Sequence, residues 1–267
     1  MSEDEGQILG GCVVSLDGVV IGYDPNNPLV RVPDLTINYG EIVAITGSSG
    51  VGKTTLLRTI AGLIKPISGT LRVCDTTLPS EPPRGSVGYI PQRLGLVKHA
   101  SVRHNVMLGA RAGHTKPLSL LPSKEVMEHT SYSIERMGLT DKTYEPIRRL
   151  SGGQQRRVAT ARTLAQAPKL IMADEFLSEL DEETLESVMS EVTGYVRSSG
   201  AALIVVEHDV SRAKSRSKLR CTSALRIKKK YRATSRPVLS KRSRRATKDP
   251  ARLLMGASSP PRITVTN

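Results

Sequence analysis

One glycine-rich segment has the residue types and spacing needed to hold a phosphate group. It reads Gly47-Ser48-Ser49-Gly50-Val51-Gly52-Lys53-Thr54 and fits the pattern G-x-x-x-x-G-K-[ST]. Glycines let the backbone curl so that successive N–H groups point at phosphate oxygens. The lysine ammonium reaches the β- and γ-phosphates, and the threonine hydroxyl can ligate Mg²⁺. The segment predicts a nucleotide site that uses Lys53 and Thr54, and we also include Thr55 among its nucleotide-binding residues.

Two acids end a later apolar segment, Leu170-Ile171-Met172-Ala173-Asp174-Glu175. At the carboxyl end of a parallel strand, such acids face the crevice in which α/β proteins bind their ligands. Asp174 is then a candidate for the Mg²⁺ shell, and Glu175 is a candidate general base that polarises an attacking water. The pair predicts hydrolysis of a nucleoside triphosphate.

A third segment, Leu150-Ser151-Gly152-Gly153-Gln154, opens a predicted helix about 20 residues before Asp174. Ser151 is a good N-cap, and the two glycines leave N–H groups uncovered at a helix start, where anions bind. These five residues are identical to the LSGGQ signature, and the chain thereby resembles the ATP-binding cassette (ABC) ATPases. The resemblance covers about residues 10–210.

Further residues resemble other marks of that family. Gln92 matches the Q-loop glutamine, which implies contacts with the nucleotide and with Mg²⁺. His208 matches the catalytic switch histidine, which stands beside Glu175 and Lys53 as a catalytic residue. Tyr23 lies where the family places an aromatic ring on adenine, and residues 178–181 resemble the D-loop. The resemblance implies that Ser151 and Gly153 bind the γ-phosphate of the ATP held by Lys53 of the partner subunit, and that Gly152 and Gln154 belong to the same nucleotide-binding segment.

The resemblance also implies partners. Two cassettes pair head to tail with ATP and Mg²⁺ between them, and a separate transmembrane permease receives the motion. Residues 93–110 resemble the stretch that contacts the permease. A single cassette of this kind resembles the importer type, for which an external substrate-binding protein is a further candidate partner.

The elements that must position these residues are readable from apolar patterning. Residues 12–45 predict strands, with Gly18 and Gly22 at hairpin breaks, and 54–63, 154–165 and 182–196 predict helices. Short apolar strands at 42–45, 70–74, 87–90, 170–173 and 202–206 lie between these helices. Continuous apolar strands alternating with helices favour a parallel sheet covered on both faces. The predicted class is α/β: a P-loop NTPase of the ABC ATPase type, with a mainly parallel core sheet, an N-terminal antiparallel β region and a helical subdomain at about 93–155.

Composition excludes several other classes. The three cysteines lie far apart without Cys/His ligand spacing, which disfavours a disulfide framework and a structural zinc site. No apolar run approaches the ~18 residues of a membrane span. Aromatic residues make up only 3% of the chain, so stacking on nucleic-acid bases is not expected. We expect a cytoplasmic protein, peripheral on the inner face of the cell membrane, and we do not expect nucleic acid as a partner.

The net charge of +14 is unevenly divided. Residues 211–267 carry 18 Lys and Arg and a single acid, whereas residues 1–210 have a net charge of −3. The predicted domains are therefore an ABC ATPase domain at 1–210 and a basic tail at 211–267. For the tail, three interpretations stay open: a disordered extension, a product of an altered reading frame, or an unrecognised fold in which 225–227 hints at a strand.

The leading functional prediction is the ATP-binding and ATP-hydrolysing subunit that energises transport through a separate transmembrane permease. The alternative is a soluble ABC ATPase acting on nucleic acid, the ribosome or cofactor assembly. Against it stand the lack of a tandem cassette, of a long coiled-coil insertion and of a Cys cluster. These motifs do not specify the transported substrate.

Overall fold

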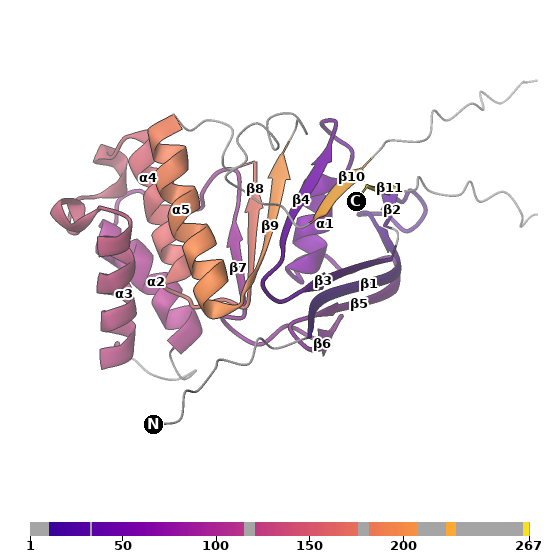
Figure 1. The fold of residues 1–267 in the computed structure, drawn as a ribbon, viewed down its shortest axis with the longest axis horizontal. Coiled ribbons are helices and arrows are strands. Elements are labelled where there is room, and N and C mark those ends of the chain that lie inside the picture. Colours follow the sequence, from indigo (N-terminus) through magenta and orange to yellow (C-terminus); the bar gives the residue numbers. More distant parts are fainter. Residues whose placement is uncertain are drawn as a thin grey trace, which may run out of the picture.

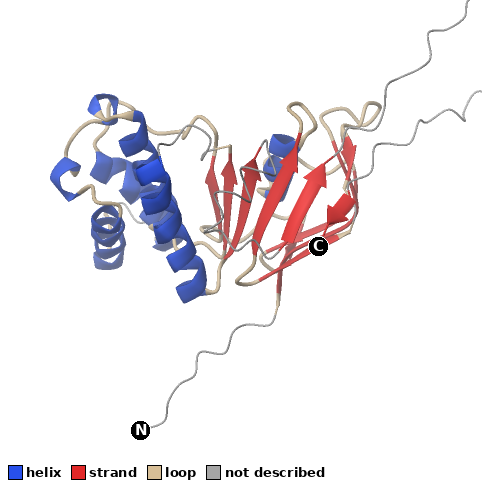
Figure 2. Cartoon of the chain, turned by 45° about the horizontal axis from the view of Figure 1, so that its top comes forward, coloured by secondary structure: helices blue, strands red, loops and turns tan. Residues whose placement is uncertain are grey.

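The computed structural model describes residues 11–32, 34–114, 121–175, 182–207, 223–227 and 264–266. An antiparallel sheet, a parallel sheet and a group of helices lie side by side along the long axis of the molecule (Figure 1). Figure 2 shows the strands of both sheets beside the helices that flank them. Within this described part of the chain, no helix is long and apolar enough to cross a membrane.

The antiparallel sheet is built around one long strand, β1 (Cys12–Ile21). Its partners are β2 (Val30–Arg31), β3 (Leu35–Asn38) and β5 (Ser68–Val73), and β5 also pairs with β6 (Thr76–Thr77). The predicted hairpin break at Gly18 is wrong, because β1 runs through it with a register shift against β5 between Asp17 and Val20. The physical reason is that Gly18 has a left-handed φ of 56°, which serves an irregularity within a continuous strand as well as a turn. The chain does turn after Ile21, since β1 and β2 pair antiparallel.

The parallel sheet brings the carboxyl ends of its strands to one edge. Its strands are β4 (Ile42–Gly47), β7 (Val87–Ile90), β8 (Leu170–Asp174), β9 (Ala202–Glu207) and β10 (Ser223–Ile227). In the order β10-β4-β9-β8-β7, Thr46 lies opposite Glu207, and Asp174 lies opposite Val206. The residues that follow β4, β7 and β8 therefore leave the sheet at the same edge and lie near one another.

Alternate residues of the parallel strands enter two cores. One face, with Val43, Ile45, Met172 and Ile204, packs on helix α1 (Lys53–Ile60) and on the antiparallel sheet. The other face packs on α5 (Glu182–Ser199), whose Val188, Val192 and Val196 are buried there. This two-sided burial explains why the strands read as unbroken apolar runs.

The helical subdomain has a core of its own. It contains α2 (Val102–His114), α3 (Lys124–Arg136), the short 3₁₀ turns η1 (Thr140–Lys142) and η2 (Ile147–Arg149), and α4 (Gly152–Leu164). The helices α2 and α4 lie so close together that a Cβ at Gly109 would overlap the carbonyl oxygen of Arg162. A Cβ at Gly113 would likewise overlap the carbonyl oxygen of Gln166, just after α4. Since α4 continues to Leu164, the predicted subdomain boundary at 155 falls inside this helix.

Part of the basic C-terminal segment belongs to the parallel sheet. β10 pairs in parallel with β4 from Ser223↔Val43 to Ile227↔Gly47, and β11 (Thr264–Thr266) pairs antiparallel with β10. The hint of a strand at 225–227 thus coincides with β10. The rest of 211–267 lies outside the described residues, so the choice among the three interpretations of that segment stays a prediction.

Most predicted element bounds differ from the observed ones by no more than three residues. Residues 54–63, for example, were predicted to be helical, and α1 spans Lys53–Ile60. Helix ends are set by capping and by tertiary contacts that local periodicity does not contain.

Candidate functional site

The glycine-rich segment forms the turn between β4 and α1. Gly50 and Gly52 have left-handed φ values of 72° and 105°, a backbone region that side chains with a Cβ disfavour. Gly52 is the N-cap residue of α1, so the free N–H groups of the first turn lie at the end of the loop. Ser48, Ser49 and Gly50 are exposed, whereas Val51 and Thr55 are buried and anchor the loop. The predicted phosphate cradle is therefore present as a local structure.

Lys53 is held over this loop. Its Nζ donates to the carbonyl oxygens of Gly47, at 2.8 Å, and Ser48, at 3.3 Å. The same ammonium lies 3.7 Å from Glu175 Oε1. A buried cation at a helix N-terminus, partnered by carbonyls and one carboxylate, concentrates positive potential where the loop N–H groups point.

Asp174 ends β8 beside the loop with only 2% of its surface exposed. Its Oδ2 accepts a hydrogen bond from the Tyr89 hydroxyl at 3.3 Å, while its Oδ1 is buried without a hydrogen-bond partner among the described residues. Burial raises the pKa of Asp174, the Thr54 hydroxyl lowers it, and the adjacent Glu175 raises it. An orphaned carboxylate oxygen next to a threonine hydroxyl fits a Mg²⁺ ligand set, because hard cations take oxygen ligands.

Glu175 and Gln92 come together from distant parts of the chain. Gln92 Nε2 donates to Glu175 Oε2 at 3.1 Å. Glu175 has a left-handed φ of 50°, and its N–H donates to the Val206 carbonyl at 3.2 Å. A non-glycine residue in this region costs about 1–2 kcal/mol, so the surrounding contacts must hold it there. The strained turn aims the carboxylate at Lys53 and Gln92.

Sequence patterns missed the residues that connect these groups. Tyr89 is a half-buried strand residue in β7, and Arg58 lies on α1, so neither carries a motif role of its own. Burial first, and then the Asp174 charge, raise the pKa of Tyr89 to about 12, which keeps its proton on the hydroxyl. Hydrogen bonds that Arg58 donates to the hydroxyl oxygens of Tyr23 and Tyr89 raise the pKa of Arg58. Arg58 thus links the predicted adenine-side ring of Tyr23, 65% exposed, to the tyrosine that holds Asp174.

The segment after Gln92 is also fixed by residues that sequence patterns missed. Arg162 of α4 donates to the carbonyl oxygens of Leu94 and Gly95, both at 2.7 Å. The buried Asn105 amide of α2 accepts from the Val97 N–H at 2.8 Å and donates to the Val97 and Ser101 carbonyls. Burial lowers the pKa of Arg162. The part of the predicted permease-contact stretch that precedes α2 is therefore held by side chains of α2 and α4.

A match to a family model decides the classification. Residues 30–178, more than half of the chain, match the model described as ABC transporter. This chain belongs to the ABC transporter family. The match contains the phosphate loop, Gln92, the signature segment, Asp174 and Glu175, and the fold is that of an ABC ATPase cassette.

Curated relatives and solved structures agree with this family. The chain is 37% identical over 190 residues to the phosphonates import ATP-binding protein PhnC 1 of Nostoc sp., covering 67% of this chain and 72% of the relative. It is 38% identical over 192 residues to the lipoprotein-releasing system ATP-binding protein LolD of Neorickettsia sennetsu, covering 68% and 80%. It spans only 53% of the length of a longer relative, the putative 2-aminoethylphosphonate import ATP-binding protein PhnT of Salmonella typhimurium, to which it is 33% identical over 202 residues. A bacterial ABC transporter cassette solved as a dimer superposes with a TM-score of 0.68 at 26% identity, over 80% of this chain and 94% of that one.

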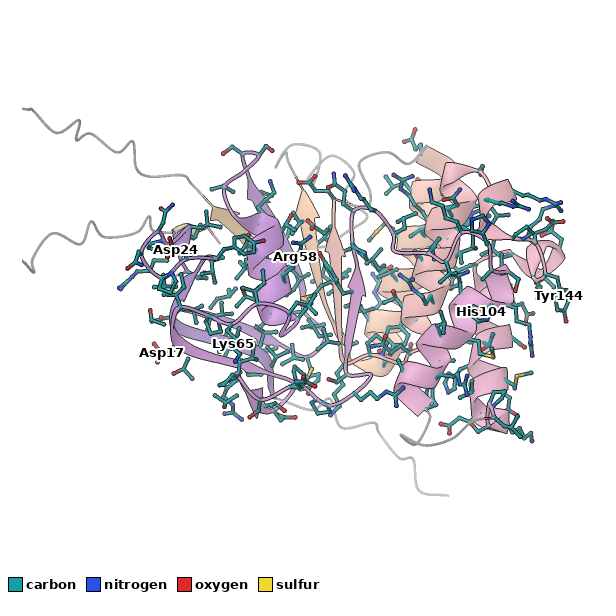
Figure 3. The ribbon with its side chains drawn as sticks, turned by 180° about the vertical axis from the view of Figure 1, so that it is seen from behind. Asp17, Asp24, Arg58, Lys65, His104 and Tyr144 are labelled. Carbon is teal, nitrogen blue, oxygen red and sulfur yellow. The ribbon has the colours of Figure 1, made fainter. Side chains whose placement is uncertain are left out.

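The signature segment of this ABC cassette lies apart from its own phosphate loop. Ser151 caps α4 and forms a capping box: its Oγ accepts from the Gln154 N–H at 3.2 Å, and Gln154 Oε1 accepts from the Ser151 N–H at 3.0 Å. Ser151 and Gly152 are exposed. Figure 1 shows α4 among the helices on one side of the parallel sheet and α1 on the other. Figure 3, from behind, shows Arg58 on α1 well away from His104 of α2 and from Tyr144.

Two predicted site features lie outside the described residues. They are His208 and the D-loop at 178–181. All other predicted site residues are described. The structure brings together Lys53, Thr54, Gln92, Asp174 and Glu175 with the loop, and it leaves Ser151, Gly152, Gly153 and Gln154 on a separate surface.

Proposed function

We propose that this cassette binds MgATP on its phosphate loop and hydrolyses it with Glu175 as the base, while a second copy supplies its signature segment. The observation that carries the proposal is the convergence of Lys53, Gln92 and Glu175 beside the buried carboxylate of Asp174. As a subunit of an ABC transporter, the chain energises transport through a separate transmembrane permease.

Each residue has a part that follows from its position. The loop N–H groups and Lys53 bind the phosphates, and Lys53 also stabilises the charge that develops on the transferring phosphoryl group. Thr54, Asp174 and Gln92 would hold Mg²⁺, which when bound neutralises phosphate charge. Tyr23 offers an exposed ring for the adenine.

Glu175 would accept the proton of the attacking water. In the described geometry both of its carboxylate oxygens face polar partners, Lys53 on one side and Gln92 on the other. Movement of the segment after Gln92 would therefore change the contacts of Glu175. This arrangement supports a link between the permease-contact stretch and the water-activating carboxylate. His208 is proposed as a further group that stabilises the transition state.

The head-to-tail dimer can be tested with two variants that damage opposite halves of the shared site. Lys53→Ala removes the phosphate ligand of the loop, and Gly152→Asp places a negative charge at the signature helix. A Cβ at Gly152 meets only Arg156 Nη1 at 3.6 Å, and an acid is favourable in the first turn of a helix, so the fold should tolerate this change. Mixed chains retain one intact site per dimer.

We expect each variant alone to remain monomeric with ATP, and the mixture to form dimers with one ATP per two chains, measured by light scattering and nucleotide titration. Both samples would carry Glu175→Gln to prevent turnover. A mixture that stays monomeric, or a single variant that dimerises as the parent does, would contradict the shared site.

The transporter assignment is tested by capturing Glu175→Gln protein with ATP from detergent-solubilised membranes of the source cell. Recovery of a polytopic membrane protein is expected, and its identity would define the substrate class. We propose an importer-type complex, with an external substrate-binding protein, at the cytoplasmic face of the membrane. Recovery only with ribosomes or nucleic acid from the soluble fraction would instead support a soluble ABC ATPase.

A further inference from the structure

Two histidines and a glutamate gather where α2 and α3 meet, in the helical subdomain. His114 is the last described residue of α2, and Glu125 and His129 lie four positions apart on α3. Residues at this spacing share one face of a helix. One potential ligand atom from each of the three side chains lies within 4.8 Å of the other two.

Among the described residues, the contacts in this cluster leave one ring nitrogen without a hydrogen-bond partner. His114 Nδ1 lies 3.0 Å from Glu125 Oε1. An ionised carboxylate only accepts hydrogen bonds, so the proton of a neutral His114 ring sits on Nδ1, and Nε2 carries a lone pair. That Nε2 is buried and has no partner among the described residues. A buried unpaired polar atom costs about 1–3 kcal/mol.

Packing alone accounts for part of this arrangement. The rings of His114 and His129 are stacked, with centroids 3.8 Å apart and an interplanar angle of 12°. Stacking explains the contact between the rings but gives the Nε2 lone pair no partner.

We propose that His114, Glu125 and His129 form a binding site for a divalent transition-metal ion of the zinc class, which links α2 to α3. Two imidazoles and a carboxylate are ligands that Zn²⁺ takes in proteins, and three protein ligands leave a fourth position for water. Sequence spacing did not reveal the site because its ligands come from two helices. It lies apart from the phosphate loop and involves no group assigned to ATP binding.

Binding requires a local rearrangement. Ring nitrogen lone pairs lie in the ring planes, so two parallel stacked rings cannot both point at one ion. At least one ring must turn from the stacked to a converging position, and Glu125 must leave His114 Nδ1 to reach an ion bound at His114 Nε2. Glu125 is 60% exposed and His129 is only partly buried, so the outer side of the cluster has room for this turn, whereas His114 is 12% exposed and stays anchored. The bound ion would then fix α3 against α2, the helix whose Asn105 holds the segment after Gln92.

The site is tested by titrating the full-length, nucleotide-free chain with Zn²⁺ in the presence of excess Mg²⁺, which occupies hard-ligand sites. His129→Gln removes a ligand, and Glu125→Gln weakens a second one at an exposed position where folding is not at risk. His104→Gln is the matched control, because His104 is an exposed histidine on α2 outside the cluster. Circular dichroism with a chelator present would verify the fold of each variant.

We expect one Zn²⁺ per chain for wild type and His104→Gln, and at least about 10-fold weaker binding for His129→Gln and Glu125→Gln, since even outer-shell changes cost 10–100-fold. Zn²⁺ should raise Tm in the first two proteins and not in His129→Gln. Equal Zn²⁺ affinity and equal Tm shifts in all four proteins would overturn the proposal, as would loss of binding confined to His104→Gln.

Discussion

Gln92 donates a hydrogen bond to Glu175 across 3.1 Å, although the two residues are 83 positions apart in the chain. Gln92 follows β7 and Glu175 follows β8, and these strands are neighbours in the parallel sheet, with Ile90 opposite Ala173. The contact is therefore a consequence of strand order. It joins the proposed water-activating carboxylate to the segment that is proposed to meet the permease.

Replacing Glu175 with Gln should abolish turnover and preserve ATP binding. The amide keeps the shape of the side chain but cannot accept a proton, and general bases typically contribute 10²–10⁴-fold to rate. We expect ATP hydrolysis to fall at least ~100-fold while ATP titration and ATP-dependent dimerisation persist. Glu191→Gln, which changes a carboxylate paired with Arg136 on the surface, is the control. Near wild-type hydrolysis by Glu175→Gln would remove Glu175 from its proposed role.

Removing the Tyr89 hydroxyl should weaken the use of Mg²⁺ specifically. Tyr89 holds Asp174 Oδ2, which leaves Oδ1 as the oxygen available to a cation. A hydrogen bond to a charged group is worth about 1.5–3 kcal/mol, so we expect Tyr89→Phe to raise the Mg²⁺ concentration for half-maximal hydrolysis about 10-fold.

ATP binding without Mg²⁺ should change little in this variant. Tyr195→Phe removes a hydroxyl that donates to the Pro168 carbonyl at 2.9 Å, away from Asp174, and serves as the control. If both variants shift the Mg²⁺ dependence equally, Tyr89 has no special relation to the cation.

Adding one methyl group at Gly113 should destabilise the cassette. A Cβ there would overlap the Gln166 carbonyl oxygen, which is backbone and cannot turn away. Overpacking typically costs about 1–3 kcal/mol, so Gly113→Ala should lower the free energy of unfolding by about that amount in a urea titration.

The same substitution at Gly194 is the matched comparison. Gly194 lies in α5 with no atom within 4 Å of an added Cβ. Alanine is better than glycine in a helix by up to about 1 kcal/mol, so Gly194→Ala should be neutral or stabilising. Destabilisation of equal size at both positions would mean that the approach of α2 to α4 is not the cause.

Deleting β10 should destabilise the parallel sheet. β4, which leads into the phosphate loop, is paired on one side with β9 and on the other with β10. A chain ending at residue 210 loses the second set of backbone hydrogen bonds, at about 0.5–1.5 kcal/mol each, so we expect it to be at least ~2 kcal/mol less stable. A chain ending at residue 230 keeps β10 and should be of intermediate stability. Equal stability of all three chains would show that residues 211–267 contribute nothing to the fold.

Sequence patterns predicted the site correctly where the residues of a motif are consecutive in the chain. The phosphate loop, its strand and its helix are consecutive, so one motif specifies all three, and the loop adopts the predicted shape. The signature helix starts with the expected serine cap for the same reason. The predicted hairpin at Gly18 was wrong because a glycine with a left-handed φ can serve either a turn or an irregularity within a continuous strand, and only the pairing with β5 distinguishes the two.

The sequence by itself determined the class of this protein, the residues of its phosphate loop, its paired acids and its signature segment, because each lies within a continuous stretch whose chemistry and spacing are readable. Only the tertiary structure decided which of them meet. It joined Gln92 to Glu175, Tyr89 to Asp174 and His114 to α3, and it put β10 beside β4. The physical reason is that strand order, register and helix packing arise from burial summed over the whole chain. That sum fixes contacts between residues whose separation in sequence carries no pattern.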